Sequence, residues 1–150
     1  MTPRGLYFEQ FEVGGEQISP ARTITEADVV LFAGLSGDYT QLHTDEEFAR
    51  QTPYGRRIAH GALVLSIATG LAARLGFIEG TALAFRELTW KFSLPVFIGD
   101  TVHVKAVCKE LKPMPRLGGG LVIFDVCVIN QEGKTVQRGD WHVLVASQPK

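Results

Sequence analysis

The stretch that decides the fold is residues 60–75, HGALVLSIATGLAARL, which carry the strongest helical pattern in the sequence. Apolar residues cover nearly every side of this helix, and Arg74 is its only charged residue. A helix that is apolar all round is expected to be enclosed by other structure rather than to lie on a surface. Gly76 follows as a typical C-terminal stop.

Four strand candidates follow this helix, at residues 82–92, 101–111, 121–130 and 135–146. In the second, Val102, Val104 and Ala106 alternate with polar residues, and residues 131–134 are typical of a hairpin turn. One buried helix and a run of antiparallel strands indicate an α+β fold with the sheet wrapped around the helix. Such a sheet leaves free edges and an uncovered outer face, so a homodimer is the expected minimum.

The N-terminal half carries weaker signals. Residues 17–23 are expected to form a first strand, and Thr25 is expected to cap a helix that ends at Ser36-Gly37. That helix is predicted to bury four apolar side chains: Val29, Phe32, Ala33 and Leu35. Residues 37–57 then lose regular periodicity, apart from a short helix near 45–50. Long irregular stretches are uncommon in compact domains and often functional.

Composition narrows the class of protein. Of the 150 residues, 45% are hydrophobic and 21% charged, which favours one globular domain over residues 1–150. The net charge of -1 offers no broad cationic surface, so neither nucleic acid nor an anionic membrane is expected as a principal partner. Cys108 and Cys127 lie in apolar runs and are interpreted as reduced core residues. With no signal-like N-terminus or membrane-length apolar run, a cytoplasmic protein is expected.

The densest run of functional residue types is residues 35–45, LSGDYTQLHTD. Asp38 and His43 are too far apart on an extended strand to share one water molecule, but they can converge on a bent loop. A carboxylate and an imidazole around one water could supply the base and the acid that hydration of a C=C bond needs. The alternative is structural: Asp38 caps a helix or forms an Asx turn, and His43 is a satisfied loop histidine.

A second feature lies where the long helix begins, at residues 58–62, IAHGA. The first N–H groups of a helix lack internal partners, and Gly61 would let a ligand oxygen approach one of them. That arrangement can stabilise negative charge on a thioester carbonyl, although Gly61 could instead serve only tight packing. His60 is interpreted as packing the helix start and as orienting the site. A metal held by His43, Asp45 and His60 is not favoured, because close histidine spacing is absent, and no metal is predicted.

Residues 32–45, FAGLSGDYTQLHTD, followed by Phe48-Ala49 and by IAHG at 58–61, resemble the MaoC-like dehydratase family. That family includes the (R)-specific enoyl-CoA hydratases. The resemblance extends more loosely to residues 92–96 and 99–102. It implies a hotdog fold, a sheet wrapped around a central helix, and a dimer in which the two sheets are continuous. Where the family usually has Asn-Pro, this chain has Thr40-Gln41.

By this resemblance, Asp38 and His43 match the catalytic pair and Gly61 the residue whose N–H binds the thioester carbonyl. Ser36 and Gly37 match the hinge of the motif, with Thr40 and His60 in support. The expected activity is hydration of trans-2-enoyl thioesters, or the reverse dehydration, on coenzyme A or an acyl carrier protein. No cofactor is expected. An acyl-thioesterase on the same fold and a non-catalytic acyl-thioester-binding subunit are the alternatives.

Two sets of residues are candidates for contacting the substrate. Coenzyme A phosphates could be bound by basic residues, although solvated surface charges are the simpler interpretation of Arg56, Arg57, Arg86, Lys91 and Arg116. An acyl pocket could be lined by aromatic residues, although core packing is the simpler interpretation of Phe85, Trp90, Phe92 and Trp141.

Overall fold

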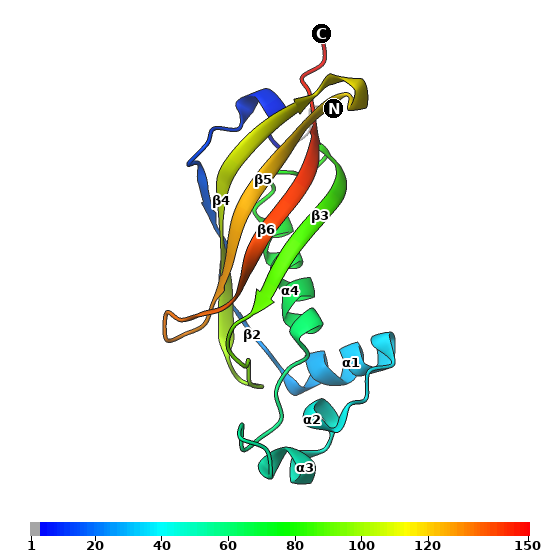
Figure 1. Ribbon diagram of the computed structural model, residues 1–150, viewed down its shortest axis with the longest axis vertical. Coiled ribbons are helices and arrows are strands. Elements are labelled where there is room, and N and C mark those ends of the chain that lie inside the picture. The colour runs from blue at the N-terminus through cyan, green and yellow to red at the C-terminus, as the bar shows by residue number, and fades with distance from the viewer. Residues whose placement is uncertain (1–3) are drawn as a thin grey trace.

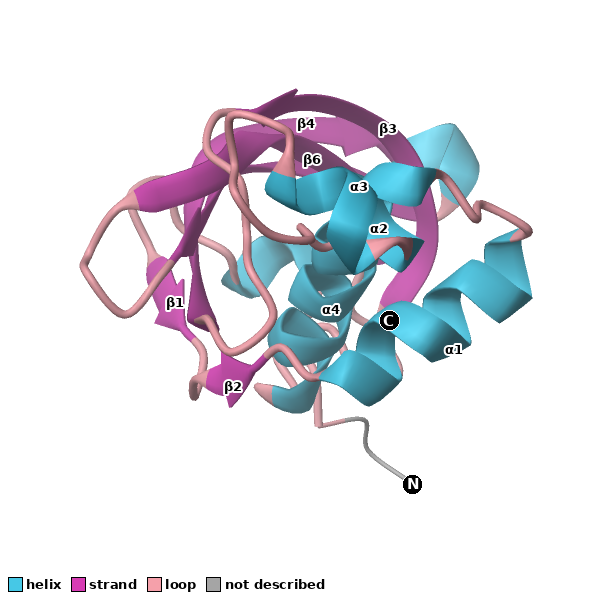
Figure 2. Ribbon diagram, turned by 90° about the horizontal axis from the view of Figure 1, so that it is seen from below, coloured by secondary structure: helices cyan, strands magenta, loops and turns pink. Residues whose placement is uncertain are grey.

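The computed structural model describes residues 4–150. A curved antiparallel sheet wraps around one long helix, α4 (Gly61–Arg74), and the helices within residues 26–50 gather at one end (Figures 1 and 2). The sheet order is β1-β4-β5-β6-β3, and β2 also pairs with β4. The strands are β1 (Glu16–Ile18), β2 (Arg22–Thr23), β3 (Ala82–Phe92), β4 (Thr101–Met114), β5 (Gly119–Ile129) and β6 (Thr135–Ala146). The predicted α+β hotdog architecture is confirmed.

The helices that accompany α4 all precede it in the sequence, except one short turn. They are η1 (Phe8–Gln10), α1 (Glu26–Ser36), α2 (Gln41–Thr44), α3 (Glu46–Arg50) and η2 (Pro115–Leu117). Figure 2 shows α1, α2 and α3 grouped around the N-terminal end of α4, beyond the rim of the sheet. The segment that carries the candidate catalytic residues therefore lies outside the sheet and close to the first turn of α4.

The concave face of the sheet and one side of α4 form the core. Val102, Val104 and Ala106 on β4 are buried, as their alternation predicts. The side of α4 that faces the sheet buries five apolar residues: Leu63, Val64, Ala68, Leu71 and Ala72. Complete enclosure of α4 was expected and is wrong for this chain, because the sheet covers only one side. The exposed residues on the other side are small, among them Ala62, Ser66, Thr69, Gly70 and Ala73.

The helix α1 begins and ends where the sequence predicts. The Thr25 side chain accepts a hydrogen bond from the Asp28 N–H, and the Asp28 carboxylate accepts one from the Thr25 N–H, which makes a capping box. Val29 and Ala33 are buried and Phe32 is half-buried, but Leu35 is 86% exposed, so its predicted burial is wrong. Leu35 lies on the exposed side of α1, together with Leu31.

Two N-terminal details differ from expectation. The single strand expected over 17–23 is divided into β1 and β2, because Pro20 lacks the N–H that would continue the ladder. Ser19 bridges the gap by bonding to Val104 through both its N–H and its hydroxyl oxygen. The four-residue helix α2 was not expected either. Its one turn is too short to produce a hydrophobic period.

The edge strand β3 leaves one side of its backbone without a strand partner within residues 4–150, since it pairs only with β6. Its exposed apolar side chains include Leu83, Phe85 and Leu88. Long apolar edges of this kind are templates for pairing with another strand. Both cysteines are free thiols, with Cys108 buried and Cys127 half-buried. No helix among the described residues is long and apolar enough to cross a membrane.

Candidate active site

The loop that carries Asp38 leaves α1 through a fixed turn. Gly37 has the left-handed conformation, with φ of 76°, which a residue with a side chain rarely adopts. The Ser36 hydroxyl donates to the Phe32 carbonyl at 2.7 Å and accepts from the Asp38 N–H at 3.1 Å. Ser36 and Gly37 therefore shape the turn after α1 and fix where Asp38 begins.

Asp38 is exposed, and one of its carboxylate oxygens is held by Thr40. Asp38 Oδ1 accepts hydrogen bonds from the Thr40 hydroxyl at 2.6 Å and from the Thr40 N–H at 3.0 Å. These two bonds keep the pKa of the Asp38 carboxyl below its usual value, and the bond from the hydroxyl has the larger effect. The Asx turn considered as a structural alternative is thus present. It occupies Oδ1 alone, and no donor within residues 4–150 bonds Oδ2, which can still accept from a water.

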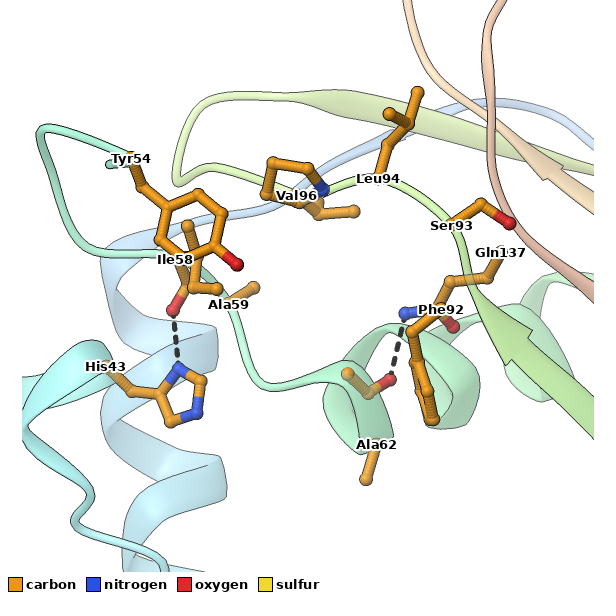
Figure 3. Close-up of a pocket in the computed structure, with 12 residues that line it drawn as sticks. His43, Tyr54, Ile58, Ala59, Ala62, Phe92, Ser93, Leu94, Val96 and Gln137 are labelled. Atoms are coloured by element: carbon orange, nitrogen blue, oxygen red, sulfur yellow. Dashed lines mark hydrogen bonds between the residues drawn. The ribbon is translucent and has the colours of Figure 1, made fainter. Parts of the chain in front are cut away.

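His43 lies on α2 with one face of its ring half-buried. Its Nδ1 lies 2.8 Å from the Ile58 carbonyl oxygen (Figure 3). A carbonyl oxygen only accepts hydrogen bonds, so Nδ1 carries the proton and Nε2 has the free lone pair. Thr44 helps to hold this turn, because its hydroxyl donates to the Tyr39 carbonyl at 2.9 Å. The ring therefore presents a basic nitrogen away from Ile58.

His60 joins the two residues. Its ring is 2% exposed, and its Nε2 donates to the Asp38 carbonyl oxygen at 2.9 Å. The same ring stacks on His43 with centroids 4.0 Å apart and planes inclined by 29°. One ligand-type atom from each of Asp38, His43 and His60 lies within 4.8 Å of the others. His60 thus both packs the start of α4 and contacts the loop, as the sequence suggests.

This cluster is poorly arranged to hold a metal ion. Asp45, considered as a ligand from the sequence, instead caps α3 by accepting the Phe48 N–H at 2.9 Å. Imidazole lone pairs lie in the ring plane, and the planes of the two stacked rings are inclined by 29°, so the lone pairs do not point into the space between the rings. His43 Nδ1 and His60 Nε2 are also already engaged with carbonyl oxygens. The geometry therefore favours acid–base chemistry over coordination.

The first turn of α4 supplies N–H groups beside His43. The first helical backbone bond is donated by Val64 to His60, so the N–H groups of Gly61, Ala62 and Leu63 precede the internal ladder. The Gly61 carbonyl accepts a hydrogen bond from Gln137 Nε2 at 3.1 Å. A side chain at residue 61 would meet ring carbons of Phe92 at 2.6 Å, so glycine is required for this close approach.

A cavity of 360 Å³ connects the histidine to the helix start. Figure 3 shows its wall, formed by the loop before α4 on one side and by the segment after β3 on the other. Its lining includes His43, Tyr54, Gly61, Phe92, Val96 and Gln137. Neither Asp38 nor His60 lines the cavity, but His60 bonds the Asp38 carbonyl and stacks on His43, which does line it. Phe85 and Trp141 line a separate apolar cavity of 220 Å³ near the other end of α4.

Three features of the site were not found from the sequence. Gln137 is 2% exposed and connects the Gly61 carbonyl to Trp90 Nε1, from which it accepts at 2.8 Å. Residues 93–96 line the cavity beside Phe92, which alone of this stretch was a candidate pocket residue from the sequence. Arg57, interpreted as a solvated charge, is instead bonded to two carboxylates. A polar residue within a buried strand was the one signal that could have identified Gln137.

Comparison with known proteins gives the family. A family model described as a MaoC like domain matches residues 10–118. The chain is 41% identical to 3-hydroxybutyryl-CoA dehydratase of Methylorubrum extorquens, with 75% of this chain and 70% of that protein covered. It is 35% identical to the (R)-specific enoyl-CoA hydratase of Rhodospirillum rubrum, with 95% and 93% covered.

Two further similarities concern length and structure. Protein MaoC of Klebsiella aerogenes is 38% identical over 72% of this chain, which spans only 32% of that longer protein. A crystal structure described as a monoamine oxidase regulatory protein from Archaeoglobus superposes with a TM-score of 0.90 at 35% identity, covering 97% of each chain. The chain belongs to the MaoC-like family.

Proposed function

We propose that this chain is a hydro-lyase that adds water to trans-2-enoyl thioesters, or removes it from 3-hydroxyacyl thioesters, with Asp38 and His43 as its acid–base pair. The observation that carries the proposal is the convergence of the Asp38 carboxylate and the His43 ring, within one 4.8 Å cluster, next to the first turn of α4. Relatives named as a 3-hydroxybutyryl-CoA dehydratase and an (R)-specific enoyl-CoA hydratase support this reaction and a coenzyme A thioester as substrate.

The reaction follows from the free atoms of the pair. A water molecule donates one hydrogen bond to His43 Nε2 and the other to Asp38 Oδ2, which leaves an oxygen lone pair for the β-carbon. His43 accepts a proton as the oxygen bonds that carbon, and the C=C electron pair moves toward the thioester oxygen. The α-carbon then takes a proton from the pair on the same face, so that addition is syn.

The negative charge that develops on the thioester oxygen needs donors that are already in place. The Gly61 N–H lies at the positive end of α4, where a preorganised donor stabilises an enolate-like oxygen more than water does. Gln137 holds the Gly61 carbonyl, and the Phe92 ring packs against the Gly61 α-carbon. We assign Gly61 as the carbonyl-binding residue.

The replacement of Asn-Pro by Thr40-Gln41 is compatible with this reaction. Thr40 donates to Asp38 through both its hydroxyl and its N–H, so the carboxylate is oriented without an amide side chain. Thr40 is therefore a supporting residue for Asp38, and His60 supports both members of the pair.

The decisive experiment is hydration of crotonyl-CoA by the purified chain. Loss of the enoyl absorbance without release of free thiol is expected, whereas thiol release would identify a thioesterase. Asp38→Asn and His43→Gln are each expected to lower kcat by about 10²–10⁴-fold, the usual contribution of acid–base catalysis. An Asp38→Asn protein that folds normally and keeps full hydratase activity would disprove the assignment.

We also propose that two copies of the chain pair through β3 and form a continuous sheet. The free backbone edge of β3 and its exposed Leu83, Phe85 and Leu88 support this arrangement, because a second copy would satisfy the edge and cover the apolar side chains together.

A further inference from the structure

Arg57 makes the most extensive ion-pair network of the described residues. Its Nη1 and Nη2 donate to the two carboxylate oxygens of Glu26 at 2.9 and 2.7 Å. Its Nε donates to Glu46. The Arg57 side chain is only 19% exposed. A planar guanidinium that is bidentate to one carboxylate and bonded to a second fixes both partners in direction as well as distance.

The two carboxylates belong to different helices. Glu26 lies in the first turn of α1 and Glu46 in the first turn of α3. The Asp38–His43 segment lies between these helices in the sequence, so one guanidinium links the helix that precedes the segment to the helix that follows it. The two carboxylates hold the pKa of Arg57 above its usual range, Glu26 more than Glu46, and Arg57 in turn lowers the pKa of Glu26.

Arg57 also directly precedes the residue that orients His43. The Ile58 carbonyl accepts from His43 Nδ1, and the Ile58 N–H donates to the Leu42 carbonyl at 3.3 Å. The next N–H, of Ala59, donates to the Val96 carbonyl at 2.7 Å on the opposite wall of the cavity. The backbone at residues 58–59 therefore orients the His43 ring. Arg57, the preceding residue, connects this backbone to α1 and α3 through its ion pairs.

The neighbouring residue, Arg56, does not share these ion pairs. Arg56 is exposed, and its guanidinium lies 4.0 Å from the centroid of the Phe97 ring. No carboxylate within residues 4–150 forms an ion pair with it.

We propose that Arg57 is a positioning residue for the reaction, which sets the Ile58 carbonyl against His43 Nδ1 and thereby fixes the basic nitrogen toward the cavity. This inference rests on the proposed hydratase function. It predicts that replacing Arg57 slows the chemical step and leaves substrate affinity nearly unchanged, because Arg57 lines neither of the two cavities described above.

The test is Arg57→Met in the full chain, assayed with crotonyl-CoA. We expect kcat to fall about tenfold with KM within about twofold of wild type, since small misplacements of a catalytic group are costly. Arg138→Met is the control: Arg138 also pairs with a carboxylate, Asp125 at 2.9 Å, but its exposed side chain lies on the face of the sheet opposite to that of the buried Gln137. It should leave both constants unchanged.

A second readout does not depend on activity. In protein labelled with ¹⁵N-histidine, the wild type should show His43 protonated at Nδ1, and Arg57→Met should show a mixture of the two tautomers. If Arg57→Met fails to fold, Glu46→Gln and Arg57→Lys, which remove part of the network, are expected to give intermediate losses of kcat.

Each outcome has one meaning. Wild-type protein without hydratase activity would overturn the proposed function. Active wild-type protein whose folded Arg57→Met variant keeps its kcat and its His43 tautomer would overturn the role of Arg57 alone.

Discussion

The imidazole of His43 stacks on that of His60, with the ring centroids 4.0 Å apart, while each ring donates to a different backbone carbonyl. His43 is fixed by Ile58 and His60 by Asp38, so each donation sets one tautomer and the stacking sets the relative orientation. The two residues of the proposed acid–base pair, Asp38 and His43, are thus linked through a third residue, His60, which does not itself need to exchange a proton.

The supporting role of His60 can be tested by removing or replacing the hydrogen bond that its Nε2 donates. His60→Leu removes the donor to the Asp38 carbonyl, and we expect kcat to fall about tenfold as the loop loosens. His60→Gln places an amide N–H close to the position of Nε2 and should recover most of that loss. Crotonyl-CoA hydration measures both variants, and equal activities of Leu and Gln at this position would show that the hydrogen bond is unimportant.

Thr40 is expected to control the acidity of Asp38. Thr40→Val removes the stronger of the two donors, which destabilises the carboxylate relative to the protonated acid, so the pKa of Asp38 should rise toward its ordinary value. The ionised form would then be lost at a higher pH than in the wild type. Titration of the Asp38 carboxyl carbon by ¹³C NMR gives this shift directly. Thr44→Val, whose hydroxyl bonds only backbone carbonyls, is the control and should not move it.

Gln137 is expected to contribute to stability as well as to the site. Gln137→Leu leaves the half-buried Trp90 N–H without its acceptor, at a cost of about 1–3 kcal/mol in the free energy of unfolding. Urea denaturation measures this loss. Trp90→Phe removes the same bond from the other side, so the double variant should lose less than the two single losses added together. If the two losses of unfolding free energy were strictly additive, the Gln137–Trp90 hydrogen bond would not contribute to stability.

Alanine substitution distinguishes the role of Gly61 from that of an ordinary glycine in the same helix. Gly61→Ala brings a methyl group against the exposed Phe92 ring, which must move into the cavity, and kcat/KM should fall about tenfold. Adding Phe92→Ala should restore part of the loss. Gly70→Ala on the same helix meets nothing within 4 Å and should keep full activity while stabilising α4 by about 0.5–1 kcal/mol. Unchanged kinetics of Gly61→Ala would count against a crowded carbonyl site.

The proposed pairing of β3 predicts a change of mass. Leu83→Glu with Leu88→Glu should convert a dimer into a monomer in sedimentation velocity experiments, because charges would face the partner edge. Val13→Glu changes an apolar residue that is also exposed, in a turn remote from β3, and should leave the dimer intact. Persistence of the dimer in the double variant would place the interface elsewhere.

Local sequence patterns were sufficient for most of the fold. The Thr25 cap, the left-handed Gly37 and the limits of α4, β3 and β6 follow from residues adjacent in the chain. Contacts between distant segments were not predictable in this way. His60 reaches Asp38 across 22 residues, and Gln137 reaches Gly61 across 76. Such pairs depend on the path of the chain in space, and a single sequence does not encode that path as a local period.

The segment between Ala33 and Ala49 contains no buried residue, although it holds both Asp38 and His43. Damage to this segment can therefore abolish turnover while the sheet and α4 remain folded. Inactive copies would accumulate to normal amounts and escape quality control, which removes proteins that expose their interiors. Abundance in a cell would consequently be a poor guide to whether this protein is working.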